Sequence, residues 1–151
     1  MHSSTKKISA GVAAVTLVTS LMVATTPASA AEMSTSAMPA VCASLPKTTT
    51  ESDGIPGPVF WSRLQCMASM DSERPYRGPI DGVMGPNSWL GVTARLKVGG
   101  YFEGPLSNAN NAGSVFALQR WALDHNRPIG ALNQWSKPTY RAVAWCLNRS
   151  F

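Results

Sequence analysis

The sequence predicts an all-α protein, a small bundle of about four short helices joined by ordered loops rich in glycine and proline. Two observations predict this fold class. Apolar residues recur at helical spacing in four segments of the chain. The loops before the last three segments also resemble one another: residues 78–92 align without a gap with residues 104–118, and residues 127–143 align after a short adjustment. Such a repeat predicts one packed unit built from similar loop–helix pieces.

Residues 1–30 of this 151-residue chain have the pattern of a secretory signal peptide. Lys6 and Lys7 precede a run of small and apolar residues that extends from residue 8 to residue 24. Ala28-Ser29-Ala30 then supplies the small residues that a signal peptidase accepts. We therefore expect a secreted, extracellular bacterial protein, either free or associated with the cell wall.

Two other interpretations of this leader stay open. The apolar run could anchor the chain in a membrane, but it is short for a bilayer crossing, and Gly11 and Ser20 dilute it. Cys42 could carry a lipid, but Val41 stands before it, where lipid attachment normally needs a small residue. We therefore expect no stable membrane insertion after cleavage.

Residues 31–57 are expected to form a flexible tail and linker. Alanine, serine, threonine, methionine and proline dominate this stretch, and residues 48–57 offer no periodic apolar face. Such a stretch buries too little apolar surface to offset the entropy lost when it becomes ordered. The globular part is therefore expected to be one helical repeat domain over residues 58–151, which is long enough for one compact core.

The expected helices cover residues 58–70, 86–97, 112–124 and 137–148. Their apolar residues follow an i, i+3, i+7 spacing, which is the buried stripe of an amphipathic helix. The stripe residues are Trp61, Leu64 and Ala68, then Trp89, Val92 and Leu96, then Val115, Leu118 and Ala122, then Tyr140, Val143 and Leu147. A proline at or next to the start of the second and fourth helices suits the first helical turn, where its missing N–H costs nothing.

The charge balance argues against nucleic acid as a partner. The chain has 13 Lys and Arg against 8 Asp and Glu, and removal of the leader with its two lysines leaves a net charge of 11 − 8 = +3. The basic residues are scattered singly rather than grouped in a patch, so we expect no nucleic-acid binding. A mild positive charge favours contact with an anionic cell envelope.

Three cysteines remain in the exported part: Cys42, Cys66 and Cys146. An oxidising compartment makes one disulfide the expectation, and the remaining thiol is then either buried or paired with a disulfide-linked partner chain. Three pairings are open. A bridge that involves Cys42 is weakly favoured, because it would tie the flexible segment to the folded part. No pair has chelating spacing, so we expect no metal site.

Residues 76–89 read Tyr-Arg-Gly-Pro-Ile-Asp-Gly-Val-Met-Gly-Pro-Asn-Ser-Trp, and Leu64-Gln65 and Leu118-Gln119 stand on the preceding and following helices. The chain is similar here to the helical peptidoglycan-binding domain family, which pairs a Leu-Gln helix with a Tyr-x-Gly-Pro-x-Asp-Gly-x-x-Gly loop and a second helix. The resemblance covers residues 58–148. It implies an exported, non-catalytic protein whose partner is peptidoglycan, through either the glycan or the stem peptide.

The first loop supplies most of the candidate contacts. The candidate ligand-binding residues are Tyr76, Arg77, Asp81, Asn87 and Tyr101. An aromatic face can stack on a sugar ring, and Arg77 can meet a stem-peptide carboxylate. Two of the polar candidates have a structural alternative: Asp81 can hold the turn by accepting backbone N–H groups, and Asn87, like its neighbour Ser88, can cap the helix. Trp89 falls in the core stripe, so burial is its expected role.

The later copies of the loop depart from the first. Ser107 and Asn108 replace the Asp-Gly pair in the second copy, and Gly130 takes the place of the aspartate in the third. If the loops contact ligand, only the first is intact, and the others have drifted toward a scaffolding role.

No catalytic residue, cofactor or metal is expected. His125 is the only histidine after the leader, and a zinc hydrolase needs several ligands around its metal. No catalytic cysteine motif surrounds Cys146, and nothing indicates that any two of Glu73, Asp81 and Glu103 face each other across a groove. The alternatives to wall binding are an exported repeat scaffold that binds another protein and, less favoured, a small cell-wall hydrolase.

Overall fold

The computed structural model describes residues 38–151, which belong to one compact unit, and helices are the only regular elements in that range. The helices are α1 (Ala40–Ser44), α2 (Thr50–Asp53), α3 (Pro58–Ser69), α4 (Pro86–Val98), α5 (Ala112–Asp124) and α6 (Lys137–Ser150). The prediction of a small all-α bundle is confirmed. The expected signal peptide, residues 1–30, lies outside the described residues. None of the helices in residues 38–151 is both long and apolar enough to span a bilayer.

The four longer helices match the expected ones at their starts, and their ends differ by two residues or fewer. Local chemistry explains the starts. Prolines occupy the first turns of α3, α4 and α6, where an N–H would have no helical partner. At the start of α5 the side chain of Asn111 accepts a hydrogen bond from the backbone N–H of Ser114, and Ser136 does the same for Thr139 in α6.

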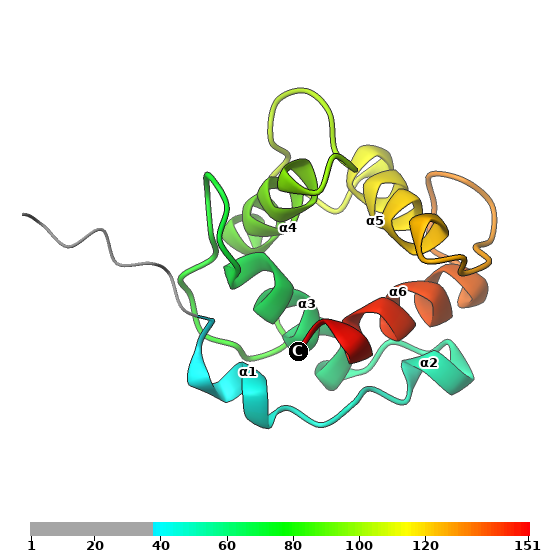
Figure 1. Ribbon diagram of the computed structural model, residues 1–151, viewed down its shortest axis with the longest axis horizontal. Helices are drawn as coiled ribbons and strands as arrows, with labels where there is room; N and C mark the ends of the chain where they lie inside the picture. The colour runs from blue at the N-terminus through cyan, green and yellow to red at the C-terminus, as the bar shows by residue number, and fades with distance from the viewer. Residues whose placement is uncertain (1–37) are drawn as a thin grey trace, which may run out of the picture. The chain divides into compact units, whose positions relative to one another are not determined.

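The long helices pack in chain order around a shared core, α3 on α4, α4 on α5 and α5 on α6, and α6 returns to α3 (Figure 1). Ten of the twelve predicted stripe residues are buried in this core, while Trp61 and Tyr140 are half-buried at its edge. Because each helix turns its stripe toward two neighbours, helices too short to be stable alone become stable together.

Aromatic contacts join the start of α3 to the start of α6. Trp135 stacks on Tyr140 with ring centroids 4.4 Å apart and planes only 7° from parallel. Phe60 and Trp61 of α3 meet both rings edge-on. Such edge-on and offset arrangements are the favoured ones for aromatic pairs, so they stabilise this corner beyond their buried area.

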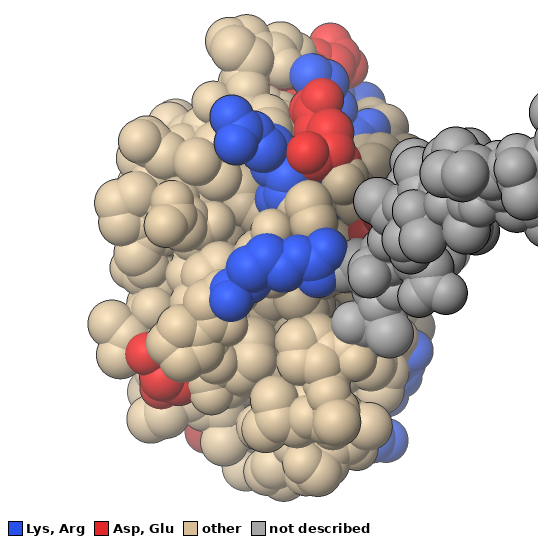
Figure 2. Space-filling model, turned by 90° about the vertical axis from the view of Figure 1, so that its left-hand side faces the viewer, with Lys and Arg blue, Asp and Glu red and all other residues tan. Residues whose placement is uncertain are grey.

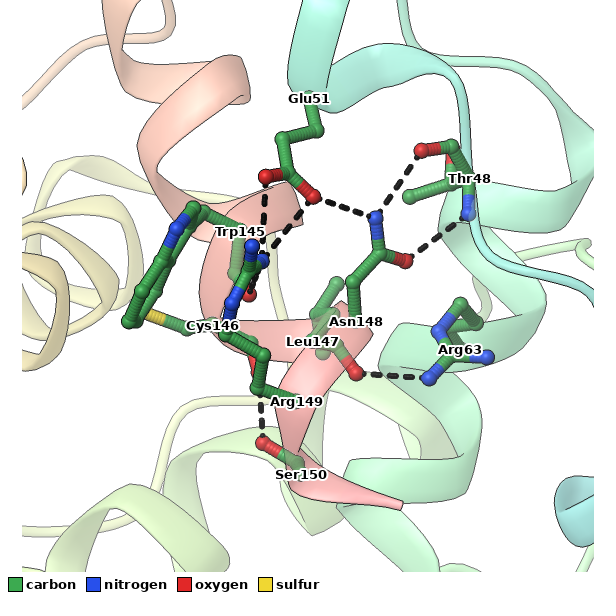
Figure 3. A network of polar contacts seen from close by, with 9 residues as sticks. All are labelled: Thr48, Glu51, Arg63, Trp145, Cys146, Leu147, Asn148, Arg149 and Ser150. Carbon is green, nitrogen blue, oxygen red and sulfur yellow. Dashed lines mark hydrogen bonds and ion pairs between the residues drawn. The ribbon is translucent and has the colours of Figure 1, made fainter.

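The segment before α3 is part of the fold, which corrects the expectation of a flexible tail and linker for residues 38–57. α2 packs against α6, and Thr48 and Thr50 are buried. The cause is polar rather than apolar burial. Asn148 of α6 accepts a hydrogen bond from the backbone N–H of Thr48 and donates one to its carbonyl, at 2.8 Å and 3.1 Å (Figure 3). These bonds replace the water that the backbone would otherwise need.

Arg63 ties this segment to both α3 and α6. Its side chain is 1% exposed, and its two terminal nitrogens donate to four backbone carbonyls. Two belong to Leu45 and Pro46, and two to Leu147 and Phe151 at the end of α6. Burial lowers the pKa of Arg63 from its ordinary value. The guanidinium therefore serves as a cap for helix-end carbonyls as well as a link between distant segments.

A disulfide joins Cys42 of α1 to Cys66 of α3, which confirms the weakly favoured bridge through Cys42. Cys146 of α6 is a free thiol and is buried, the first of the two fates expected for the third cysteine. The bridge adds a covalent tie at the beginning of the described chain, where Arg63 and Asn148 supply the hydrogen-bonded ones.

Candidate functional site

Gln65 holds the loop between α3 and α4 in place. Its side chain is fully buried, and its amide oxygen accepts hydrogen bonds from the backbone N–H groups of Asp81 and Gly82, at 3.0 Å and 2.8 Å. Its amide nitrogen donates to the Asp81 carboxylate at 2.9 Å and to the carbonyl of Val83 at 3.0 Å. All the hydrogen-bonding capacity of the amide oxygen and nitrogen is thus directed at this one loop. Four hydrogen bonds thus fix the loop to a side chain of a core helix.

Asp81 holds the turn, which is the structural alternative to ligand binding. The same oxygen that receives the Gln65 amide also accepts the backbone N–H of Val83 at 2.8 Å. These hydrogen bonds, the one from Gln65 first, lower the pKa of the Asp81 carboxyl below its ordinary value. Gly82 follows with φ +77°, and a Cβ there would lie 2.8 Å from the carbonyl oxygen of Pro58. Asp-Gly is therefore required by the turn itself.

Tyr76 forms the base of the loop rather than a free stacking face. It is 8% exposed, its backbone N–H donates to Ala68 at 2.8 Å, and its hydroxyl donates to the carbonyl of Pro79 at 2.9 Å. A Cβ at Gly78 would overlap the Tyr76 phenol, so glycine lets the loop cross directly over the ring. Gly91 likewise lets α4 approach Tyr76, because a Cβ there would lie 2.9 Å from the tyrosine Cβ.

A groove of about 700 Å³ opens beside this loop, between residues 73–79 and the first turns of α4. Three of the five candidate residues line it: Tyr76 at its base, Arg77 from the loop and Asn87 from the start of α4. Arg77 and Asn87 are both exposed, and Leu90 supplies an apolar wall. The structure thus brings together a guanidinium, an amide and an apolar surface, the combination typical of sites for polar ligands.

The groove is mildly cationic. Arg74 and Arg77 line it together with Glu73, whose carboxylate pairs with Lys97 at 3.3 Å. Figure 2 shows one face of the molecule, on which basic side chains lie in separate groups, some of them next to acidic ones, on a mostly uncharged surface. A long polyanion would find no continuous row of cations on that face, so recognition there depends on individual side chains.

Tyr101 lies outside the groove. Its hydroxyl donates to the Asp124 carboxylate at 2.7 Å, and it lines a separate cavity of about 200 Å³ bordered by Met67, Arg95 and Trp121. The hydrogen bond to Asp124 raises the pKa of Tyr101, and burial adds to the effect. The structure therefore does not place Tyr101 with the other candidates, and it gives the hydroxyl a structural partner.

Ser88 and Trp89 adopt the structural roles considered for them. The Ser88 hydroxyl accepts the backbone N–H of Gly85 at 3.4 Å and is buried at the start of α4, so it acts at the helix start rather than on a ligand. Trp89 is buried in the core cluster. Of the helix-start residues considered, Asn87 is the one whose side chain is left at the groove surface.

The second and third copies of the loop are also held by a side chain of the preceding helix, at the register that Gln65 has in α3. This side chain is Thr93 for the second copy and Gln119 for the third. The Gln119 amide donates to the carbonyls of Ala131 and Gln134 and accepts the backbone N–H of Asn133. Thr93 holds the middle loop through its hydroxyl, which bonds both the N–H and the carbonyl of Ser107. The Leu-Gln motif pointed to Gln119, but no feature of the sequence singled out Thr93.

Residues 38–151 include the side chains that a metal site or a catalytic His or Cys would use. No three potential metal ligands among them lie close enough to hold an ion. His125 is exposed, and its Nδ1 lies 2.9 Å from the carbonyl oxygen of Trp121. Burial raises the pKa of Cys146 to about 12, which keeps it a thiol rather than a reactive thiolate at neutral pH.

Comparison with protein-family models, with curated proteins and with solved structures gives no match for this chain.

Proposed function

We propose that this chain is an exported, non-catalytic protein that binds peptidoglycan in the groove between the α3–α4 loop and the start of α4. The observation that carries the proposal is the pairing of Arg77 and Asn87 at one open groove whose loop is fixed by Gln65. A guanidinium suits a stem-peptide carboxylate, and an amide suits the hydroxyl and acetamido groups of an amino sugar. The loop sequence that resembles peptidoglycan-binding domains forms this same groove.

Preorganisation supports the proposal. Gln65, Asp81 and Tyr76 already satisfy backbone groups of the loop that forms one side of the groove. A site held in its binding geometry loses little entropy when the ligand enters. The disulfide between Cys42 and Cys66 supports export, since such bonds persist in oxidising compartments. Together with the leader pattern, it favours a secreted protein.

The test is co-sedimentation of the purified protein with insoluble peptidoglycan. Arg77→Ala combined with Asn87→Ala should weaken binding by about tenfold or more, equivalent to about 1.4 kcal/mol. Arg95→Ala is the matched control: it removes an arginine of α4 that lies outside the groove, and binding should stay at the level of the unchanged protein. Both variants should keep the helical circular dichroism spectrum.

Three results would contradict the proposal in different ways. Protein that stays in the supernatant would favour a scaffold for another protein. Undiminished sedimentation of the double variant would place the site elsewhere. Release of soluble muropeptides over time would indicate a cell-wall hydrolase.

A further inference from the structure

A second groove, of about 280 Å³, lies beside the loop between α5 and α6. Arg127 and Pro128 line it from the loop, Pro138, Arg141 and Trp145 from α6, and Glu51 from α2. No candidate residue from the sequence lies in it, because its members are spread over more than ninety residues of chain. The helices and the loop bring them together.

This second groove is the repeat counterpart of the first. The loop copies that start at Gly78 and Arg127 align, so Arg127 takes the place of Gly78 and Pro128 the place of Pro79. In the helices that follow, Trp89 aligns with Tyr140, so Arg141 takes the place of Leu90. Together with Pro138 in the place of Asn87, four of the seven lining residues of the second groove thus correspond to lining residues of the first, whereas Glu51, Ala142 and Trp145 have no counterpart there.

The anchors of the two loops correspond as well. Gln119 of α5 donates to the carbonyls of Ala131 and Gln134, as Gln65 of α3 donates to the carbonyl of Val83. At two aligned positions the second groove has Arg127 and Arg141 where the first has Gly78 and Leu90, while the glutamine that supports the loop is the same. Drift into pure scaffolding would preserve the support but would not place two arginines on one groove.

The charges in the second groove do not cancel. Arg149 pairs with Glu51 at 3.0 Å and lies over the Trp145 ring, 4.1 Å from its centroid (Figure 3). Asn148 donates to the other Glu51 oxygen at 2.8 Å. Burial opposes ionisation of Glu51, but the hydrogen bonds from Arg149 and Asn148 prevail and lower its pKa. The carboxylate is thus ionised and already satisfied within the protein.

Arg127 and Arg141 have no such partner. Within residues 38–151 neither makes an ion pair. Arg127 lies over the same Trp145 ring at 4.8 Å from its centroid, and the contact orients its guanidinium at the groove. Arg141 is exposed one helical turn before Trp145. Two guanidiniums, one of them oriented by its contact with the indole, and two prolines line a surface suited to an anion that carries a short apolar chain.

We propose that this second groove binds the carboxylate of a short peptide, with Arg127 and Arg141 on the carboxylate and Trp145 against the adjoining aliphatic part. The protein then has one ligand site beside the α3–α4 loop and another beside the α5–α6 loop. The identity of the peptide as a wall stem peptide rests on the proposed function, whereas the carboxylate subsite rests on this groove alone. Two sites on one wall polymer would raise its overall binding strength above that of either site.

The test follows the indole N–H resonance of Trp145 by NMR, assigned with Trp145→Phe. The probe is N-acetyl-D-alanyl-D-alanine, and its C-terminal carboxamide is the matched neutral probe. The acid should shift the Trp145 resonance in a saturable way and the carboxamide should not. Arg141→Gln should weaken this response at least about fivefold, and Arg127→Gln combined with Arg141→Gln should abolish it. Arg95→Ala should leave it unchanged.

Several outcomes would overturn the carboxylate subsite. These are no saturable shift with the acid, an equal shift with the carboxamide, or a response that survives the double Arg→Gln change. Tighter saturation by inorganic phosphate than by the acid would assign the groove to a phosphate instead. The two proposals fail separately: a Trp145 response without wall sedimentation removes only the proposed function, and sedimentation without a Trp145 response removes only the second subsite.

Discussion

Gln65 and Gln119 occupy the same register in α3 and α5, and each holds the loop that follows its helix. The amide nitrogen donates to backbone carbonyls of that loop, and the amide oxygen accepts from backbone N–H groups. The two helix–loop–helix halves are therefore built on one plan even though their loop sequences differ. A groove lies beside each of the two loops. The residues that line the groove differ between the two halves, whereas a glutamine supports the loop in both.

Gln65→Ala is expected to destabilise the protein by about 3 kcal/mol, because four hydrogen bonds are lost and buried backbone groups are left without partners. Urea unfolding measures the loss, and hydrogen exchange should quicken first at the amide of Gly82, whose partner is removed. Gln119→Ala is the matched change in the other half and should quicken exchange at Asn133 instead. If the free energy of unfolding of Gln65→Ala lies within about 0.5 kcal/mol of that of the unchanged protein, Gln65 does not hold the loop in the way described.

Reduction of the disulfide between Cys42 and Cys66 is expected to cost about 3 kcal/mol, since it releases a loop of 24 residues in the unfolded chain. The measurement is urea unfolding with and without a reductant. In the Cys42→Ala, Cys66→Ala double variant the reductant should have no effect. If the reductant also shifts the unfolding midpoint of that variant, the stability lost on reduction does not come from this disulfide.

The thiol of Cys146 is expected to make stability fall at high pH. Its pKa is raised to about 12 in the folded protein, above the ordinary value near 8.5, so folding favours the protonated form. The contribution is complete below about pH 8.5 and is lost as the pH rises toward 12, at up to about 1.4 kcal/mol per pH unit. Cys146→Ala should remove this part of the slope. Rapid labelling of the folded protein by a thiol reagent at pH 8 would contradict the burial.

Arg63→Met is expected to destabilise the protein by about 3 kcal/mol, because four backbone carbonyls lose their donors. Hydrogen exchange should quicken in residues 45–57 and at the end of α6 together, since Arg63 links those two regions. The control is Arg95→Met, because Arg95 is a half-buried arginine that does not bond a comparable group of backbone carbonyls. Unchanged exchange in residues 45–57 would contradict the role of Arg63 and would leave that segment to the disulfide and the Asn148 hydrogen bonds.

The long helices could be predicted from the sequence because apolar periodicity and start signals act locally. Residues 38–57 could not, since their order depends on Asn148 meeting Thr48 from a hundred residues away and on Arg63 reaching four carbonyls. Composition shows how little apolar surface such a segment has. It does not show that a distant amide and guanidinium will satisfy its backbone.

The first groove could be predicted in part. Tyr76, Arg77 and Asn87 do come together, because they flank one tight loop. The prediction for Tyr101 depends only on the suitability of aromatic rings for sugars, and the structure shows its hydroxyl bonded to Asp124 outside the groove. The second groove left no signal, because Arg127, Arg141 and Trp145 meet only once α5 and α6 have packed. Whether the placed residues contact ligand stays a prediction.

If the loop held by Gln65 and the start of α4 form the wall-binding surface, soluble muropeptides should bind there. A titration of isotope-labelled protein with soluble muropeptides, followed through the backbone amide resonances, tests this. We expect the largest saturable shifts at Arg77, Gly78 and Asn87. Shifts that are absent, or that cluster around Tyr101 and leave those three amides unmoved, would contradict it.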